Sequence, residues 1–384
     1  KAFVAQIVAA YLLALRLGRA RGTITREQGA ALVDELRVLR PKMEQLLGET
    51  AVKAVRGIAA WFVVLYHIRA RTPWLPDGVM ALAHKGYLAV DFFFLLSGFV
   101  IWLSAREDFA ARGLAATGAF LRRRMARIYP LYAVMLALTI LFAALVHTTG
   151  RDMDNYPWAE LPLHILMLQN WGFTDALSWN HPAWSISTEL AAYLLFPLIA
   201  LLPLARAPRW TLLIGIAMLI GGMAAALHGM GFHTLGQNIP HTGLIRCLAE
   251  FTAGCLLCAL WQKGVDAQAR LALIGTTLVA VGGWLINPAN ELWAFPLIAT
   301  SAIYLIADFS RSGRTIWRPL VFLGEISYAT YLSHFMLFIW FKIAFVKDAA
   351  NIQPHLIALF LALTFLASVL LYQWVEVPGR RLAR

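Results

Sequence analysis

The sequence is poor in charge and in cysteine, and each shortage limits what the protein can be. Only 14% of the 384 residues are charged and 60% are hydrophobic, which excludes an ordinary soluble globular protein. The three cysteines, Cys247, Cys255 and Cys258, fall in one apolar stretch. The last two form a Cys-x-x-Cys pair with no second pair, so we expect buried, inert thiols and no metal site.

The chain is rich instead in apolar blocks close to the ~20 residues that cross a bilayer, separated by short polar or arginine-rich loops. This pattern predicts an all-α polytopic membrane protein, with about ten transmembrane helices in one domain over 51–384. The expected spans are roughly 52–68, 86–104, 129–147, 184–204, 210–228, 241–261, 271–286, 291–307, 320–341 and 355–375.

Residues 1–50 differ from the rest and predict an N-terminal amphipathic, interfacial helical extension. The apolar stretch 3–17 is too short to span a bilayer comfortably and is followed by arginines, which is typical of an interfacial helix. Thr25 and Gln28 have the spacing of a capping box, which predicts a second helix that ends at Pro41.

The basic residues indicate topology rather than nucleic-acid binding. The net charge is +12, but the charges lie mostly at the ends of apolar spans. Loop 105–128 has six basic and two acidic residues, whereas loop 148–183 has one basic and four acidic residues. The positive-inside rule therefore predicts that both termini are cytoplasmic. Loop 69–85, with three basic residues on the outer side, goes against the rule.

Arg56 and His67 stand eleven residues apart in an otherwise apolar run. On a helix this spacing advances roughly 16 Å and returns to nearly the same face. The residues between them on that face are small, so the first span offers an inner cation, a groove and an outer imidazole. The alternative is that small residues admit a neighbouring helix and the arginine is an interfacial anchor.

Four ionisable groups from four spans share one predicted depth in the outer half of the membrane. They are His67, Asp91, Glu189 and His334. An ionised group in hydrocarbon costs roughly 2.5–3.5 kcal/mol or more unless it faces a cavity or a partner. The level is therefore a functional site or a structural network of paired groups. Arg246 and Glu250, four apart, are expected to pair along one helix face.

A cluster of arginines precedes the third span: Arg122, Arg123, Arg124 and Arg127. Such clusters usually set topology and contact lipid headgroups. Together with Arg56 on the same side, this cluster also suits a polyphosphate, because guanidinium groups bind phosphate oxygens bidentately.

Five motifs occur in order along the chain and are followed by Glu376-Val-Pro378. They are Arg56-x10-His67, Asp91-Phe-Phe-Phe-Leu-Leu-Ser-Gly-Phe99, Arg124-Met-Ala-Arg127-Ile-Tyr-Pro-Leu-Tyr132, Trp184-Ser-Ile-Ser-Thr-Glu189 and Ile326-Ser-Tyr-Ala-Thr-Tyr-Leu-Ser-His334. Over about residues 53–381 the chain resembles the membrane acyltransferase-3 family, the bacterial integral-membrane O-acyltransferases that modify surface and secreted glycans.

The resemblance implies transfer of an acyl group, usually acetyl, from cytoplasmic acyl-CoA across the bacterial inner membrane to a sugar hydroxyl. It implies that Arg56 and His67 are essential and that the motif arginines, Arg124 and Arg127, contact the donor. Our hypothesis is that His67 is the general base, because histidine titrates near neutral pH. Asp91 or Glu189 would hold its other ring nitrogen, and the sequence does not decide between them.

The acceptor side is assigned to aromatic and histidine side chains: Trp184, Tyr328, Tyr331, His181 and His334. The aromatic residues stack on a sugar or belong to the interfacial belt. A covalent route, in which a serine such as Ser97 or His67 itself carries the acyl group, stays open. A transporter or flippase stays open as well, although we find no internal repeat of the kind transporters often carry. The acceptor, a glycan or a small molecule such as an antibiotic sugar, stays open too.

Overall fold

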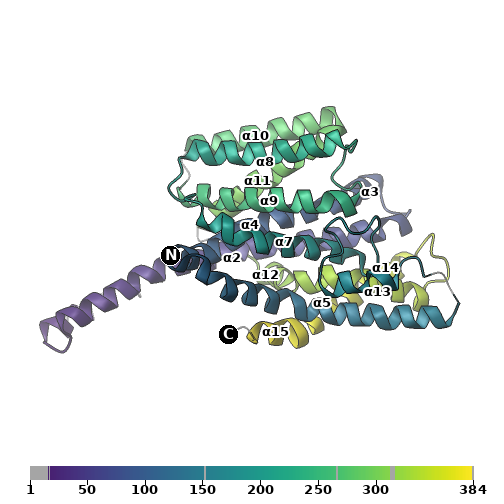
Figure 1. The fold of residues 1–384 in the computed structure, drawn as a ribbon, viewed down its shortest axis with the longest axis horizontal. Helices are drawn as coiled ribbons and strands as arrows, with labels where there is room; N and C mark the ends of the chain where they lie inside the picture. Colours follow the sequence, from purple (N-terminus) through teal and green to yellow (C-terminus); the bar gives the residue numbers. More distant parts are fainter. Residues whose placement is uncertain (1–15, 17, 151–152, 265–266, 312–315, 383–384) are drawn as a thin grey trace.

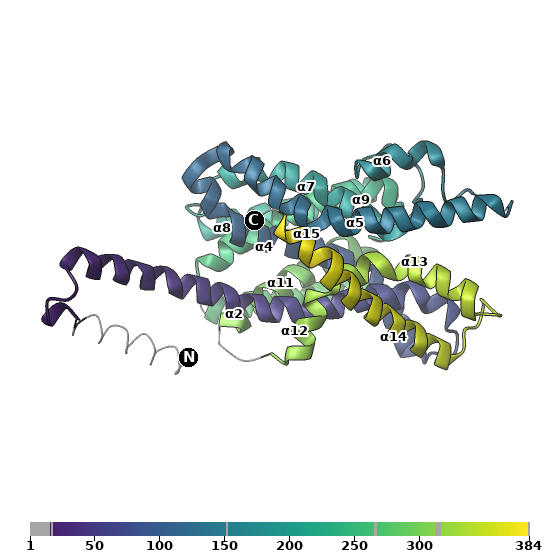
Figure 2. The same cartoon turned by 90° about the horizontal axis from the view of Figure 1, so that it is seen from below.

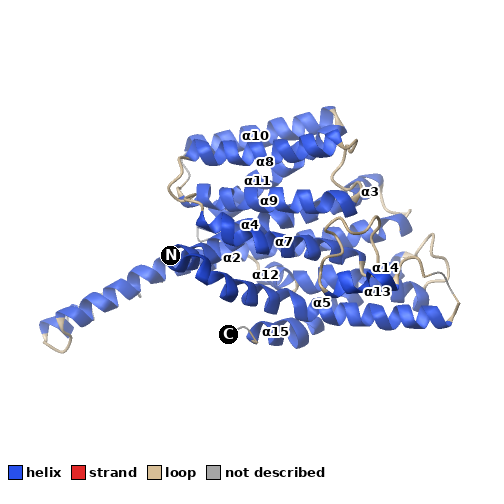
Figure 3. Ribbon diagram, in the orientation of Figure 1, coloured by secondary structure: helices blue, strands red, loops and turns tan. Residues whose placement is uncertain are grey.

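The structure is a computed structural model that describes residues 16, 18–150, 153–264, 267–311 and 316–382. In that part of the chain the regular structure is helical and no strand occurs (Figure 3). The long helices are α2 (Arg26–Ile68), α4 (Ala89–Arg112), α5 (Thr117–Thr148), α7 (Trp184–Leu201), α8 (Arg209–Gly229), α9 (Ile239–Gln262), α10 (Ala267–Ile286), α11 (Glu291–Arg311), α13 (Ser327–Phe345) and α14 (Pro354–Leu371). Shorter helices are α3 (Asp77–His84), α6 (Leu161–Ile165), α12 (Arg318–Glu325) and α15 (Val377–Arg381).

Each of the ten predicted spans coincides with a long helix, and α12 and α13 together fill the ninth. By length and hydropathy, seven segments of the described chain qualify as membrane spans, and one of them, Asp77–Thr148, contains both α4 and α5. The prediction of an all-α polytopic membrane protein is therefore confirmed. The long helices lie side by side along one direction, with α8 and α10 in the outermost layer (Figure 1).

The helix that contains the first span begins far earlier than expected, although the span itself, Thr50–Arg71, agrees with the prediction. The predicted capping box is present, since Thr25 Oγ1 accepts from the amide of Gln28 and Gln28 Oε1 accepts from the amide of Thr25. The helix does not end at Pro41, however, but continues unbroken for 43 residues to Ile68. A proline removes one backbone donor and its cost of ~3 kcal/mol is local, so a long, capped helix can absorb it. The expected interfacial helix over 3–17 lies almost wholly outside the described residues.

The start of α2 projects from the bundle, whereas its second half enters it (Figure 1, Figure 2). At the centre, α4 and α9 pack with their backbones nearly touching. A Cβ atom at Gly98 would overlap the carbonyl oxygen of Phe251, and one at Gly254 would overlap that of Leu95. Close approach through small residues is typical of helices that associate within membranes.

The outside of the bundle is apolar. Large exposed hydrophobic side chains gather on α8, α10 and α14, among them Leu213, Met218, Leu278, Val279 and Leu366. Such a surface suits lipid rather than water. Ionisable side chains of the spans, by contrast, are concentrated inside, where they form the site.

The terminal Glu376-Val-Pro378 motif lies where a π-helical turn, Tyr372–Glu376, joins α14 to α15. Because Gly379 has no side chain, α15 approaches α5 closely, and a Cβ there would lie 2.6 Å from Pro130 Cγ. Glu376 is buried and pairs with Arg380. The motif therefore closes the bundle beside the arginine-rich start of α5.

Candidate active site

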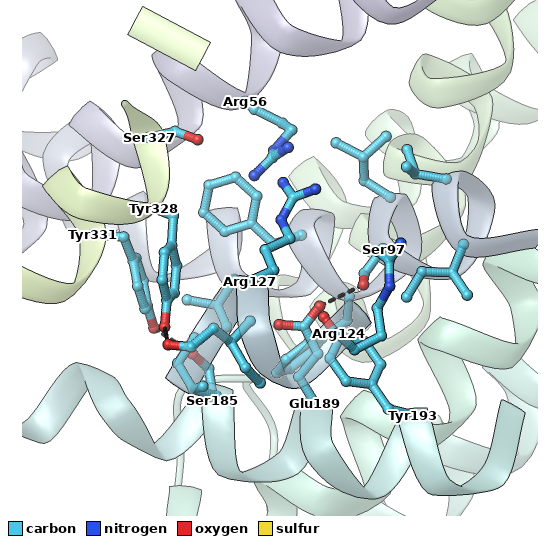
Figure 4. A pocket seen from close by; sticks show the side chains of 18 residues that line it. Arg56, Ser97, Arg124, Arg127, Ser185, Glu189, Tyr193, Ser327, Tyr328 and Tyr331 are labelled. Atoms are coloured by element: carbon cyan, nitrogen blue, oxygen red, sulfur yellow. Dashed lines mark hydrogen bonds between the residues drawn. The ribbon is translucent and has the colours of Figure 1, made fainter. Parts of the chain in front are cut away.

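A cavity of about 110 Å³ lies between α2, α4, α5, α7 and α13. It is lined by three of the arginines that we predicted would bind the donor. Arg56 enters from α2, and Arg124 and Arg127 enter from α5 (Figure 4). The α5 pair shares a face because residues three apart are neighbours on a helix. Arg124 Nε is buried and lacks a hydrogen-bond partner among the described residues. The cavity therefore presents donors suited to an anion.

Arg123 is not part of this cavity. It points away from the cavity wall and donates to Asp108 Oδ2 at 2.8 Å, with 40% of its side chain exposed. One residue along a helix turns the side chain by about 100°, so Arg123 and Arg124 cannot share a face. Of the four predicted cofactor-binding arginines, the structure brings three together and leaves Arg123 outside.

Glu189 lies in the same arginine-lined cavity. Ser97 Oγ donates to Glu189 Oε1 at 2.5 Å, and both side chains line the wall (Figure 4). Three guanidinium groups against one carboxylate leave the described wall with an excess of positive charge. Tyr328, also in the wall, donates its hydroxyl proton to the carbonyl of Ile128 at 2.7 Å, which ties α13 to α5.

His67 faces a second, larger cavity of about 300 Å³. Trp184, His181 and Tyr331, all predicted for the acceptor side, line it too. The His67 ring lies 5.0 Å from that of His334, centroid to centroid. In the described part of the chain, no hydrogen bond reaches either ring nitrogen of His67. Its surroundings are aromatic and cationic rather than acidic.

His334 has a fixed tautomer. Its Nδ1 donates to the carbonyl of Tyr331 at 2.7 Å, so this nitrogen carries the proton. Nε2 is buried and has no partner among the described residues. The neutral ring therefore offers a lone pair on the side away from its own helix, and it is packed against His67.

Neither predicted orienting carboxylate lies at His67. Asp91 accepts two hydrogen bonds from Arg246, at 2.9 Å from Nε and 2.7 Å from Nη2, and both side chains are buried. Glu189 lies in the other cavity. Arg246 therefore pairs with Asp91 and not, as expected, with Glu250. A bidentate pair between two helices satisfies the charges of Arg246 and Asp91 better than a pair of neighbours on one helix can.

Several residues around the larger cavity were not predicted. Tyr66, Arg69, Tyr87 and Phe335 line it beside His67, and Arg246, which we expected to pair with Glu250, lines it too. Tyr87 is held by the buried Glu291, which also accepts from Lys85 Nζ at 2.6 Å. Lys85 was one of the residues that went against the positive-inside rule. Glu291, a lone carboxylate at the start of an apolar span, was the signal in the sequence that could have identified the partner of Lys85.

A polar loop closes the histidine end of the bundle. His164 Nε2 and Ser178 Oγ are 3.0 Å apart, and Ser178 donates its proton to Glu160 at 2.6 Å, so His164 is the donor to Ser178. Tyr132 ties this loop to α5 by donating to the carbonyl of His164 at 2.6 Å. Burial, with a smaller effect of the positive charge of His181, lowers the pKa of His164 from 6.5 to about 4.

Two cavities thus lie along α2, one beside Arg56 and one beside His67. Residues 49–373 match the family described as the acyltransferase domain. The chain belongs to this acyltransferase family. The match covers all five sequence motifs, and the resemblance drawn from them is confirmed. The boundary expected at residue 50 stays a prediction.

Two relatives of this acyltransferase are similar to it over most of its length. Acyltransferase MdmB of Streptomyces mycarofaciens is 29% identical over 368 residues, which cover 86% of this chain and 92% of MdmB. O-acetyltransferase OatA of Staphylococcus aureus is 24% identical over 363 residues, or 85% of this chain. The matched region is 56% of OatA, so this chain spans about half of that relative. No solved structure matches.

Proposed function

We propose that this acyltransferase moves an acetyl group from cytoplasmic acetyl-CoA to a hydroxyl of a sugar or glycoconjugate on the other side of the membrane. The observation that carries the proposal is the pair of cavities along α2, one holding Arg56 and the other His67. The phosphates of CoA bind among the arginines, and the pantetheine arm follows α2 until the thioester reaches His67. The similarity to OatA, an O-acetyltransferase, supports the acetyl group and the oxygen acceptor.

The proposed orientation puts the arginine end of the bundle, with both chain termini, in the cytoplasm of a bacterial cell. The basic loop 105–128 lies at that end, and the acidic loop 148–183 lies at the other. The donor and the acceptor then approach from opposite sides of the inner membrane. Lipid contacts the apolar faces of α8, α10 and α14.

In the proposed reaction, His67 removes the proton from the acceptor hydroxyl as its oxygen attacks the thioester carbonyl carbon. The new C–O bond forms, the C–S bond breaks, and the departing CoA sulfur takes the proton from the imidazolium. His334, in ring contact with His67, occupies the positioning place that we expected of a carboxylate. Arg246 and Trp184 line the cavity in which the acceptor would lie.

Donor binding tests the proposal first. We expect acetyl-CoA and free CoA to raise the unfolding temperature of the detergent-purified protein, because a ligand at 100 times its Kd stabilises by about 2.7 kcal/mol. Arg127→Gln should abolish the shift. Arg123→Gln is the matched control, since it removes a guanidinium of the same cluster that faces away from the cavity, and it should keep the shift.

Two outcomes would contradict the proposal. If neither ligand shifts the unfolding temperature, the arginines serve topology and a carrier for a glycoconjugate becomes the better hypothesis. If donor binding holds but His67→Ala retains near wild-type transfer, His67 is not the base and the covalent route, through Ser97 or Ser185, takes its place.

A further inference from the structure

The two cavities meet at one place. Their described linings share two residues, Val90 of α4 and Tyr331 of α13. The same four helices, α2, α4, α7 and α13, contribute to both walls. Val90 and Tyr331, each of which is 5% exposed, therefore border both cavities and form the partition that a group travelling from the arginine cavity to His67 would have to pass.

The Tyr331 ring is held from several directions. Its hydroxyl lies 2.7 Å from Ser185 Oγ (Figure 4). It also donates to the carbonyl of Pro182 at 3.0 Å. The ring of Phe93 meets it edge-on at a centroid distance of 6.1 Å. Protein interiors are close-packed, and a side chain pinned at both its ring and its hydroxyl does not yield freely to extra volume.

We propose that Val90 and Tyr331 form a size filter that admits a two-carbon acyl group and excludes longer chains. The inference rests on the proposed function, in which the CoA part of the donor stays among the arginines. Its acyl end enters the constriction first, and the thioester end of the pantetheine arm follows until the carbonyl carbon meets His67. In that position a longer tail has to lie against the held Tyr331 ring, which also lines the His67 cavity, and one extra methylene in a confined site is discriminated by roughly 10–200-fold.

The test uses His67→Cys as a chemical trap, so no acceptor is needed. Bromoacetyl-CoA and 2-bromohexanoyl-CoA carry bromine on the same carbon and differ only in the tail. The introduced thiolate attacks that carbon, a C–S bond forms, and bromide leaves. Peptide mass mapping separates this adduct from any at the native cysteines, which are buried. Each rate is divided by that of the same reagent with free glutathione.

We expect the bromoacetyl reagent to label the trap at least about tenfold faster after this correction. Adding Val90→Ala or Tyr331→Ala should bring the two rates together, whereas Tyr331→Phe keeps the ring and should preserve most of the difference. Val100→Ala is the matched control, because it enlarges the arginine cavity without touching the constriction. The ratio should be unchanged there.

If the two reagents label the His67→Cys variant at equal corrected rates, the size filter is overturned, but the proposed path of the donor to residue 67 is supported. A difference that survives Val90→Ala would overturn it too, and this variant carries the test if Tyr331→Ala does not fold. Failure of the proposed function is distinct, because neither reagent would label the trap in any variant and acetyl-CoA would give no thermal shift.

Discussion

Asp91 takes both of its hydrogen bonds from Arg246, and Glu291 accepts from Lys85, Tyr87 and a backbone amide. Each pair joins helices or loops that are far apart in the sequence. Asp91 and Arg246 are both buried, and removing one partner of such a pair leaves an uncompensated charge, which typically costs about 3–5 kcal/mol. The Lys85 side chain is 41% exposed, so its removal should cost less. These residues are therefore expected to hold the bundle together, and they fix the walls of the cavity that contains His67.

His164 gives a pH dependence to the stability of the polar loop. Its folded pKa is about 4 and its ordinary value is 6.5. Below pH 6.5 the unfolded chain binds a proton that the folded loop does not, so stability is full above 6.5 and is lost as the pH falls towards 4. The loss approaches about 3 kcal/mol. We expect the unfolding temperature in detergent to fall over this interval.

His164→Gln should flatten this part of the pH profile, because an amide can still donate to Ser178 but does not titrate. His147→Gln, at an exposed histidine near the end of α5, is the control and should leave the profile unchanged. A profile that His164→Gln leaves as steep as the parent's would assign the acid sensitivity to other groups.

At the scale of helices, the seam between α4 and α9 depends on two glycines. Gly254→Ala would place a methyl group against the carbonyl oxygen of Leu95, which belongs to the backbone and cannot rotate away. Overpacking of this kind costs typically 1–3 kcal/mol. We expect the unfolding temperature to fall by several degrees, measured in detergent with and without acetyl-CoA.

Gly222→Ala provides the comparison for that experiment. Gly222 lies within α8 on the exposed side, and a Cβ there meets nothing within 4 Å. Alanine should therefore be neutral or stabilising, by up to about 1 kcal/mol. If both alanine variants behave alike, the α4–α9 seam is looser than the close approach of its backbones indicates.

The helices could be predicted from the sequence because hydropathy and length decide them locally. The separation of Arg56 from His67 along one helix could be predicted as well, and the two residues line different cavities. The side chains that pair with one another could not be predicted, because the pairing depends on which face each helix turns toward its neighbours. Asp91 and Glu189 share a predicted level with His67, yet one faces α9 and the other the arginine cavity. The prediction that a helix ends at Pro41 was wrong because it relied on one local signal. The rest of the long helix α2 outweighed the effect of the proline.

For the whole molecule, the proposed orientation makes a direct prediction about access. Asp175 is fully exposed in the loop before α7, and Leu382 is 84% exposed near the chain end. In intact cells, a membrane-impermeant maleimide should label the thiol of Asp175→Cys and spare that of Leu382→Cys. Permeabilised cells should show both. The reverse pattern would invert the molecule and place the arginines outside the cell.

The two cavities along α2 also bear on what would have to cross the membrane in the proposed function. The nucleotide part of the donor would remain among the arginines, and only the thioester end of the pantetheine arm, with its acyl group, would enter the partition at Val90 and Tyr331. Neither the whole donor nor the acceptor would then have to cross, so the proposed reaction requires no alternating open states. In this proposal the protein exports an acyl group while the cell keeps its coenzyme.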